Sequence, residues 1–169
     1  MQFNHRLRAE HRELNYPHCL IGAICGVILG VFSIILAGRF FVLYTFLMLP
    51  RSAFPAIVFL IFFIAQFALC GAIVASLISC PHRHRRRRRN AALLIMCTQI
   101  ALKAIWFPTT FGSLSFLFSV LIITLAAMIC FYAIRYIICV NAVTVIAALA
   151  HFIWLVYLVW FSLAIFLLN

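Results

Sequence analysis

The fold is decided by the stretch QIALKAIWFPTTF, residues 99–111. It contains Lys103, and Arg135 is the only other charged residue between positions 91 and 169. A charge at the centre of a lipid-facing helix costs about 2.5–3.5 kcal/mol or more, so such a residue normally faces protein or a water-filled space. Gln99, Lys103 and Trp106 are spaced i, i+4 and i+7, which puts them on one helical face. We interpret this face as the wall of an internal site.

Pro108 bears on where Lys103 lies in the membrane. A proline inside a helical pattern ends or kinks the helix, so we expect the helix to break just after Trp106. Lys103 would then lie about one turn from a helix end, where its ammonium group could extend to the lipid headgroups. The sequence leaves open whether Lys103 faces an internal pocket or the headgroups.

The composition excludes a soluble domain. Of the 169 residues, 68% are hydrophobic and 9% are charged, against about 25% charged in a typical soluble domain. The apolar runs are long and continuous rather than alternating, which disfavours a membrane β-barrel. We therefore predict an all-α integral membrane bundle that takes up nearly the whole chain.

Five transmembrane helices are expected, which form a single domain over residues 18–169 after a polar tail at 1–17. The expected spans are 19–37, 56–79, 91–107, 115–139 and 144–168. A four-span alternative would merge residues 91–139, but the turn residues from Pro108 to Ser113 argue against it. The link at 40–54 is apolar for a solvent loop, so we expect it to fold back over the mouth of the bundle.

Basic residues flank the spans and account for the net charge of +11. The tail holds three of them, the loop at 81–90 holds six, and Arg135 falls on the same side. Arg39, Arg51 and Lys103 fall on the other side. This asymmetry predicts a cytoplasm-like side for the N-terminus and the opposite side for the C-terminus.

The loop arginines are expected to contact anionic lipid headgroups. They are Arg83, Arg85, Arg86, Arg87, Arg88 and Arg89. Binding to nucleic acid is not expected, because the run is short and no aromatic residues alternate with it.

Small residues mark close helix contacts. Gly22, Gly26 and Gly30 form a G-x-x-x-G-x-x-x-G pattern, and Gly71 begins a second small-residue stripe. The partner could lie within the bundle or in a second copy of the chain, so a homodimer is possible. The repeat of phenylalanines at 59, 63 and 67 is typical of an aromatic packing ridge.

Neither a metal site nor an active site is evident. The seven cysteines are odd in number and irregularly spaced, which disfavours a disulfide framework. Cys80, His82 and His84 could ligate a metal, but adjacent arginines repel a cation and no second cluster completes a site. Both acidic residues, Glu10 and Glu13, lie in the tail. We expect no metal, no required cofactor and no catalysis; the lone His151 is more often a packed residue than a catalyst.

The pattern Gln99-x-Ala-Leu-x-x-x-Trp106-x-Pro108-x-x-Phe111-Gly112 resembles the third-helix signature of the translocator protein family (TspO/MBR, the tryptophan-rich sensory proteins). Weaker similarities before and after this pattern extend the resemblance to about residues 40–169. The resemblance implies five transmembrane helices around a pocket near the bundle mouth, lidded by the first loop. Family members bind porphyrins, haem and sterols, and their suggested roles are tetrapyrrole transport and stress signalling.

The resemblance also suggests pocket residues. With the face described above they are Ile57, Phe63, Gln99, Lys103, Trp106, Phe118, Trp154 and Leu158. The family usually has Trp at positions 57, 63 and 118 and Asn at 103, so we do not expect the porphyrin breakdown attributed to some relatives. An inward Lys103 could pair with a porphyrin propionate. The expected function is a membrane receptor or carrier for a porphyrin-type ligand or a sterol; the alternative is a non-catalytic scaffold that assembles through its glycine-rich helix faces.

Overall fold

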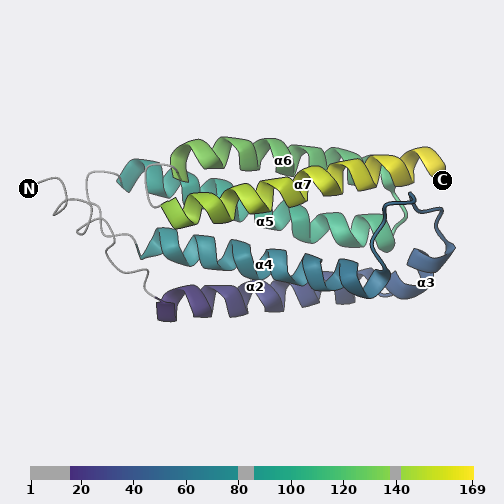
Figure 1. The fold of residues 1–169 in the computed structure, drawn as a ribbon, viewed down its shortest axis with the longest axis horizontal. Coiled ribbons are helices and arrows are strands. Elements are labelled where there is room, and N and C mark those ends of the chain that lie inside the picture. Colours follow the sequence, from purple (N-terminus) through teal and green to yellow (C-terminus); the bar gives the residue numbers. More distant parts are fainter. Residues whose placement is uncertain (1–15, 80–85, 138–141) are drawn as a thin grey trace, which may run out of the picture.

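The computed structural model describes residues 16–79, 86–137 and 142–169 (Figure 1). The helices in these ranges are α2 (Tyr16–Ala37), α3 (Phe40–Phe46), α4 (Ala56–Ile78), α5 (Arg86–Phe111), α6 (Phe116–Ile137) and α7 (Ala142–Leu168). All except the short α3 are long and apolar enough to cross a membrane. The predicted all-α membrane bundle is confirmed over these residues. Most of the predicted polar tail, together with Arg83 and Arg85, lies outside them.

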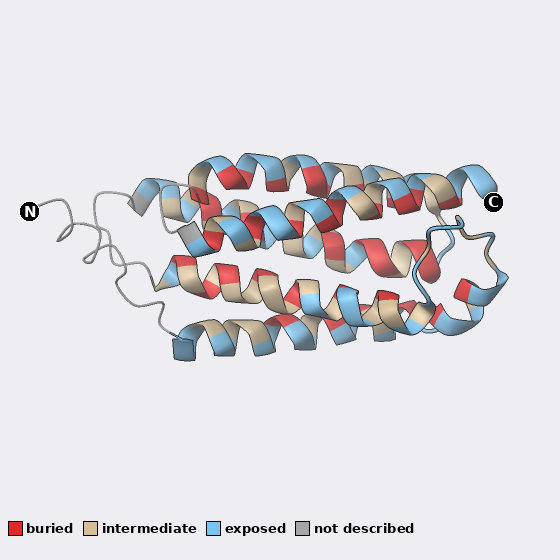
Figure 2. Ribbon diagram, in the orientation of Figure 1, coloured by how far each residue is buried: buried red, intermediate tan, exposed pale blue. Residues whose placement is uncertain are grey.

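The five long helices form a ring. In order around the ring, α2 contacts α4, α4 contacts α7, α7 contacts α6, α6 contacts α5, and α5 returns to α2. Helices α4 and α5 also contact each other. Buried residues face the inside of this ring, and exposed residues lie along its outside (Figure 2). The interior of the ring is therefore the place where polar residues could be kept away from lipid.

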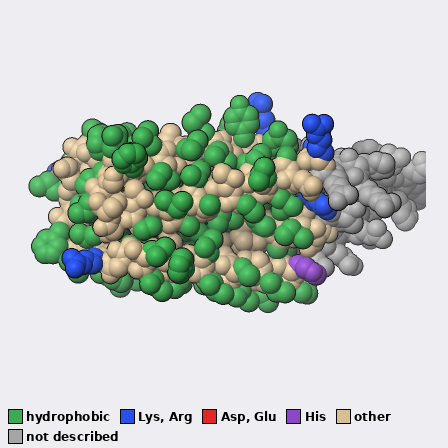
Figure 3. Space-filling model, turned by 180° about the vertical axis from the view of Figure 1, so that it is seen from behind, with side chains coloured by type: hydrophobic (Ala, Val, Ile, Leu, Met, Phe, Trp, Pro, Cys, Tyr) green, Lys and Arg blue, Asp and Glu red, His purple; other side chains and the backbone are tan. Residues whose placement is uncertain are grey.

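The outer surface is suited to a bilayer. Seen from behind, hydrophobic side chains cover the length of the bundle, and the Lys and Arg side chains in view lie toward its two ends (Figure 3). No acidic side chain occurs among the described residues, because Glu10 and Glu13 both precede them. Such a surface leaves the middle of the bundle free to contact lipid chains.

Helices α2 and α4 approach each other through glycine. A Cβ atom at Gly71 would overlap the backbone carbonyl of Gly22, and one at Gly26 would overlap the carbonyl of Phe67. At Gly30 a Cβ would lie 3.2 Å from the side chain of Phe67, which is tight but not an overlap. The helix that packs against these glycines therefore belongs to the same chain.

Helix α5 differs from the prediction at both ends. It begins at Arg86, inside the expected loop, and it continues through Pro108 to Phe111. Pro108 has no N–H, so the carbonyl of Ala104 lacks its usual helical donor. The Ser33 hydroxyl of α2 donates to that carbonyl at 2.7 Å. A side-chain donor of this kind lets a transmembrane helix keep a proline.

The segment between α2 and α4 folds back over one end of the ring, at the end where the C-terminus lies (Figure 1). The buried rings of Phe40 and Tyr44 close this end against α5. The Tyr44 hydroxyl donates to the carbonyl of Phe54 at 2.5 Å. The side chain of Asn169 accepts from the Met48 N–H at 3.0 Å and donates to the Met48 carbonyl at 3.1 Å. We call residues 40–55 the lid.

Candidate functional site

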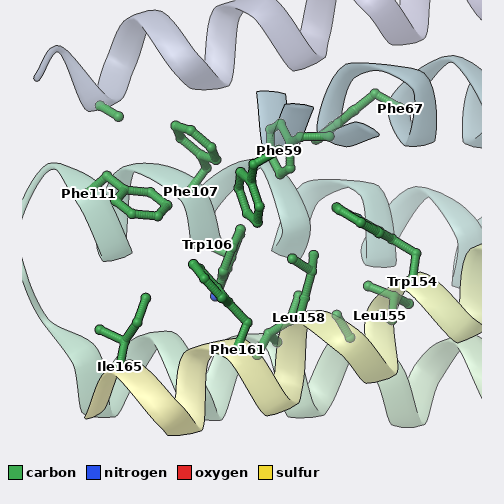
Figure 4. Close-up of a cluster of buried hydrophobic side chains, with 14 of the residues drawn as sticks. Phe59, Phe67, Trp106, Phe107, Phe111, Trp154, Leu155, Leu158, Phe161 and Ile165 are labelled. Carbon is green, nitrogen blue, oxygen red and sulfur yellow. The ribbon is translucent and has the colours of Figure 1, made fainter. Parts of the chain in front are cut away.

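The half of the ring interior next to the lid is filled by aromatic side chains (Figure 4). Rings from α4 and α5 point toward α7, where Leu158 and Phe161 meet them (Figure 4). Phe63 and Phe107 lie 4.5 Å apart between ring centroids, and Phe59 and Phe161 lie 5.1 Å apart. We call this group the aromatic cluster. Its rings occupy the region where the resemblance places a pocket.

Trp106 is held inside this cluster by one hydrogen bond. Its side chain is fully buried, and its indole Nε1–H donates to the Ser162 hydroxyl of α7 at 3.0 Å. A buried indole N–H without an acceptor would be costly, so Ser162 makes the inward position of Trp106 favourable. Nothing in the local sequence around Trp106 identifies this partner, because Ser162 lies on a different helix.

A polar layer lies beyond the aromatic cluster. Its members are Gln66 and Cys70 of α4, Gln99 and Lys103 of α5, and His151 of α7. His151 Nδ1 lies 2.8 Å from Gln66 Oε1, and its Nε2 lies 2.5 Å from the Gln99 side-chain nitrogen. With the proton on Nδ1, His151 donates to Gln66 and accepts from Gln99. The Gln99 Oε1 atom is buried and has no hydrogen-bond partner among the described residues.

Lys103 belongs to this layer and does not reach the headgroups. It is fully buried. Its Nζ lies 3.7 Å from the Cys70 Sγ and 4.0 Å from the centroid of the Phe67 ring. A thiol and an aromatic face are weak partners for an ammonium group. The described part of the chain offers no acidic side chain to pair with it.

An apolar groove runs along the outside of the ring between α2 and α5, with α4 as its floor. Its volume is about 680 Å³. His18 and Ile78 line one end, and Leu36 and Ile105 line the other. At 1.5 Å per residue, the lining of α2 spans roughly 27 Å. Because side chains along both rims are exposed, this groove faces the lipid. We call it the lateral groove.

Small and aliphatic residues make up most of the lining of the lateral groove, with two phenylalanines among them. Gly22, Gly26 and Gly71 keep its floor close to the α2 backbone. Phe67 of α4 lines the middle of the groove, and the Ser33–Ala104 pair lies toward the lid end. The hydrogen bond that accommodates Pro108 therefore also joins the two sides of the groove.

The structure separates the predicted pocket residues into two groups. Phe63, Gln99, Lys103, Trp106, Trp154 and Leu158 all lie in the bundle interior. Ile57 and Phe118 are 65% and 62% exposed and lie on the outer surface. None of the eight lines the lateral groove. The groove could not be predicted from the sequence, although its glycines and Phe67 belong to patterns that predict helix packing.

Sequence reasoning also missed most of the polar layer. Gln66 and Cys70 are four residues apart on one face of α4, and His151 is the only described histidine inside a span apart from His18 near its start. A search for polar residues at mid-span on several helices could have grouped them. Which helices adjoin one another could not be read from the chain itself.

These features define an integral multi-pass membrane protein whose bundle of five apolar helices carries a lipid-facing groove and an internal polar layer. The model of the TspO/MBR family matches residues 19–168, so the chain belongs to the TspO/MBR family. This confirms the resemblance found in the sequence. Comparisons with curated proteins and with solved structures find no match. Family membership supports a ligand-binding or transport-type role in a membrane.

Proposed function

We propose that this protein is a membrane receptor or carrier that binds a hydrophobic ligand within the bilayer. The ligand we favour is a porphyrin- or haem-type tetrapyrrole, with a sterol as the second candidate. The role would be tetrapyrrole transport or stress signalling, and the protein would bind its ligand without converting it. The observation that carries the proposal is the lateral groove of about 680 Å³, a volume within the range of small-molecule sites.

The lateral groove is a better candidate than the mouth of the bundle. The mouth is closed by the lid, and the aromatic cluster fills the space beneath it. A ligand there would have to displace several packed rings, and closely packed interiors resist such insertion. The lateral groove offers its volume without that rearrangement.

The groove also suits the chemistry of a flat macrocycle. Its lining is almost entirely apolar; the ring of Phe32 is exposed at the groove, and Phe67 lies behind it as a fully buried residue. Aromatic faces pack against flat conjugated ligands in offset arrangements. A ligand that enters from the bilayer would reach the groove laterally and would not have to pass through water.

The scaffold alternative has less support. It relied on glycine-rich faces that could hold a second copy of the chain. Gly22, Gly26 and Gly71 are covered by the contact between α2 and α4 of the same chain. A second copy would have to use another surface of the bundle.

We also propose that the N-terminus lies on the cytoplasm-like side and the C-terminus on the opposite side. Arg87, Arg88 and Arg89 lie in the first turn of α5, and Arg135 lies in the last turn of α6 at the same end of the bundle. The other end carries Arg39 and Arg51. Lys103 contributes no positive charge to either end, because it is buried in the interior of the bundle.

Binding of protoporphyrin to the purified protein in lipid nanodiscs tests the ligand role. The expected result is saturable binding, seen as a change in porphyrin fluorescence beyond that in protein-free nanodiscs. Competition by a sterol would show whether both candidates use one site. Porphyrin partitioning that is equal with and without protein would contradict the proposal.

A further inference from the structure

We propose that Lys103 binds a carboxylate of the ligand, and that the ring of Phe67 is a gate between Lys103 and the lateral groove. This inference rests on the proposed function. It names the chemical group of the tetrapyrrole that the protein recognises, namely a propionate side chain. It also assigns a role to a buried amine that has no anionic side chain beside it among the described residues.

Phe67 is the residue that the two regions share. It is one of the residues that line the lateral groove, and it is fully buried there. The Lys103 Nζ lies over its ring, 4.0 Å from the centroid. The ring therefore stands between the amine and the groove. A ligand in the groove would be one aromatic side chain away from Lys103.

Phe67 has to move before a ligand in the groove can reach Lys103, because its side chain is fully buried and packs against Gly30 of α2. Gly30 carries no side chain of its own at this contact, and the groove adjoins Phe67. A phenylalanine side chain moves between staggered rotamers as a unit. A rotation that carries the ring into the groove space or along α4 would uncover the Lys103 Nζ on the groove side.

Lys103 is suited to bind an acid group. Its neighbours are a thiol, an aromatic ring and amide or imidazole groups that already pair with one another, apart from the unpartnered Gln99 Oε1. No acidic side chain is available within the described ranges 16–79, 86–137 and 142–169. An ammonium–carboxylate hydrogen bond is short and strong, and a low-dielectric surrounding strengthens it. The apolar body of the ligand would remain in the groove.

The test compares two ligands that share one macrocycle, protoporphyrin and protoporphyrin dimethyl ester. Equilibrium binding is measured in nanodiscs for the wild-type chain and for Lys103→Met, which keeps an unbranched side chain of similar length but removes the amine. Arg135→Met is the matched control, because it removes an exposed cation away from the groove. We expect the wild type and the control to prefer the diacid at least tenfold, and Lys103→Met to bind both ligands alike. Lys103→Arg should retain part of the preference.

Two outcomes would overturn the inference in different ways. Equal binding of acid and ester by the wild type, or an unchanged preference in Lys103→Met, would show that Lys103 does not bind the carboxylate. The proposed ligand-binding function would be unaffected by that result. Absence of saturable binding for both ligands would also remove the proposed function.

The gate has its own measurement. Stopped-flow association of protoporphyrin should be several-fold faster in Phe67→Ala, and slower in Phe67→Trp, than in the wild type. Phe67→Leu provides a milder change if the alanine variant does not fold, and it should also bind faster. Association rates that do not respond to the size of residue 67 would overturn the gate.

Discussion

At the scale of single residues, several polar side chains of the bundle interior are paired with a side chain from another helix, whereas the buried Gln99 Oε1 and Trp154 Nε1 have no hydrogen-bond partner among the described residues. Trp106 depends on Ser162, and His151 bridges Gln66 and Gln99. Buried polar groups that lack a partner are far more costly than exposed ones. These pairs therefore fix which helices can be neighbours as well as how each side chain lies.

Removal of the Ser162 hydroxyl should destabilise the bundle. Ser162→Ala leaves the buried indole N–H of Trp106 without an acceptor, which costs about 1–3 kcal/mol. Reversible unfolding in mixed micelles would measure the loss. In a Trp106→Phe background the same change should cost much less, because no donor is left unpaired. Wild-type stability in Ser162→Ala would show that the hydrogen bond contributes little.

Lys103→Met should have the opposite effect on stability. A lysine near the centre of a span costs about 2.5–3.5 kcal/mol on insertion scales, and its partners here are weak. The variant should therefore unfold at a higher denaturant concentration than the wild type while it loses the preference for an acid ligand. A less stable variant would mean that Lys103 supports the fold, which would weaken its assignment to ligand binding.

The inward face of α5 could be predicted from the sequence, but the partners of its residues could not. The spacing of Gln99, Lys103 and Trp106 placed them on one face, and all three are buried. Ser162 and His151 come from α7, more than fifty positions later. The headgroup alternative for Lys103 arose because Pro108 suggested a helix end that does not exist.

At the scale of helices, α2 is held to its neighbours by glycine on one side and by Ser33 on the other. The glycine pattern predicted a close contact, and the structure supplies its partner. The continuation of α5 through Pro108 could not be predicted, because the donor that replaces the missing N–H belongs to α2. Proline in a span is therefore weak evidence for a helix end unless the neighbouring helices are known.

A graded series of alanine substitutions should show how close α2 and α4 lie. Gly71→Ala puts a methyl group into the Gly22 carbonyl, whereas Gly30→Ala meets only the Phe67 side chain. Overpacking of this kind costs about 1–3 kcal/mol. Thermal unfolding in detergent should place Gly71→Ala well below Gly30→Ala and the wild type. Equal stability of the two variants would contradict the α2–α4 contact.

The stability of the folded chain should fall at alkaline pH because of Tyr44 in the lid. Burial, together with the nearby phenol of Tyr157, raises the pKa of Tyr44 to about 12, against about 10 for an unfolded chain. Between these values the unfolded chain loses the proton while the folded chain keeps it, so stability falls as pH rises from 10 to 12. Tyr44→Phe should remove this part of the decline, as unfolding at several pH values would show. An identical pH profile in wild type and Tyr44→Phe would exclude the effect.

At the scale of the whole molecule, the structure separates a closed interior from an open flank. The lid and the aromatic cluster close the interior at one end, and the lateral groove is open to lipid along α2 and α5. Composition and motifs were enough to predict five spans, a link that folds over the mouth of the bundle, and the family. The groove could not, because its shape depends on which helices adjoin in the ring and how closely glycine lets them pack.

The measurement that tests the central claim most directly is protoporphyrin binding to a chain whose lateral groove has been filled. Ala101→Trp places a large side chain in the groove from an exposed position on α5, and Ile153→Trp places the same side chain on the lipid face of α7, away from the groove. The account predicts that Ala101→Trp weakens binding at least tenfold while Ile153→Trp binds like the wild type. Unchanged binding by Ala101→Trp would contradict the lateral groove as the ligand site.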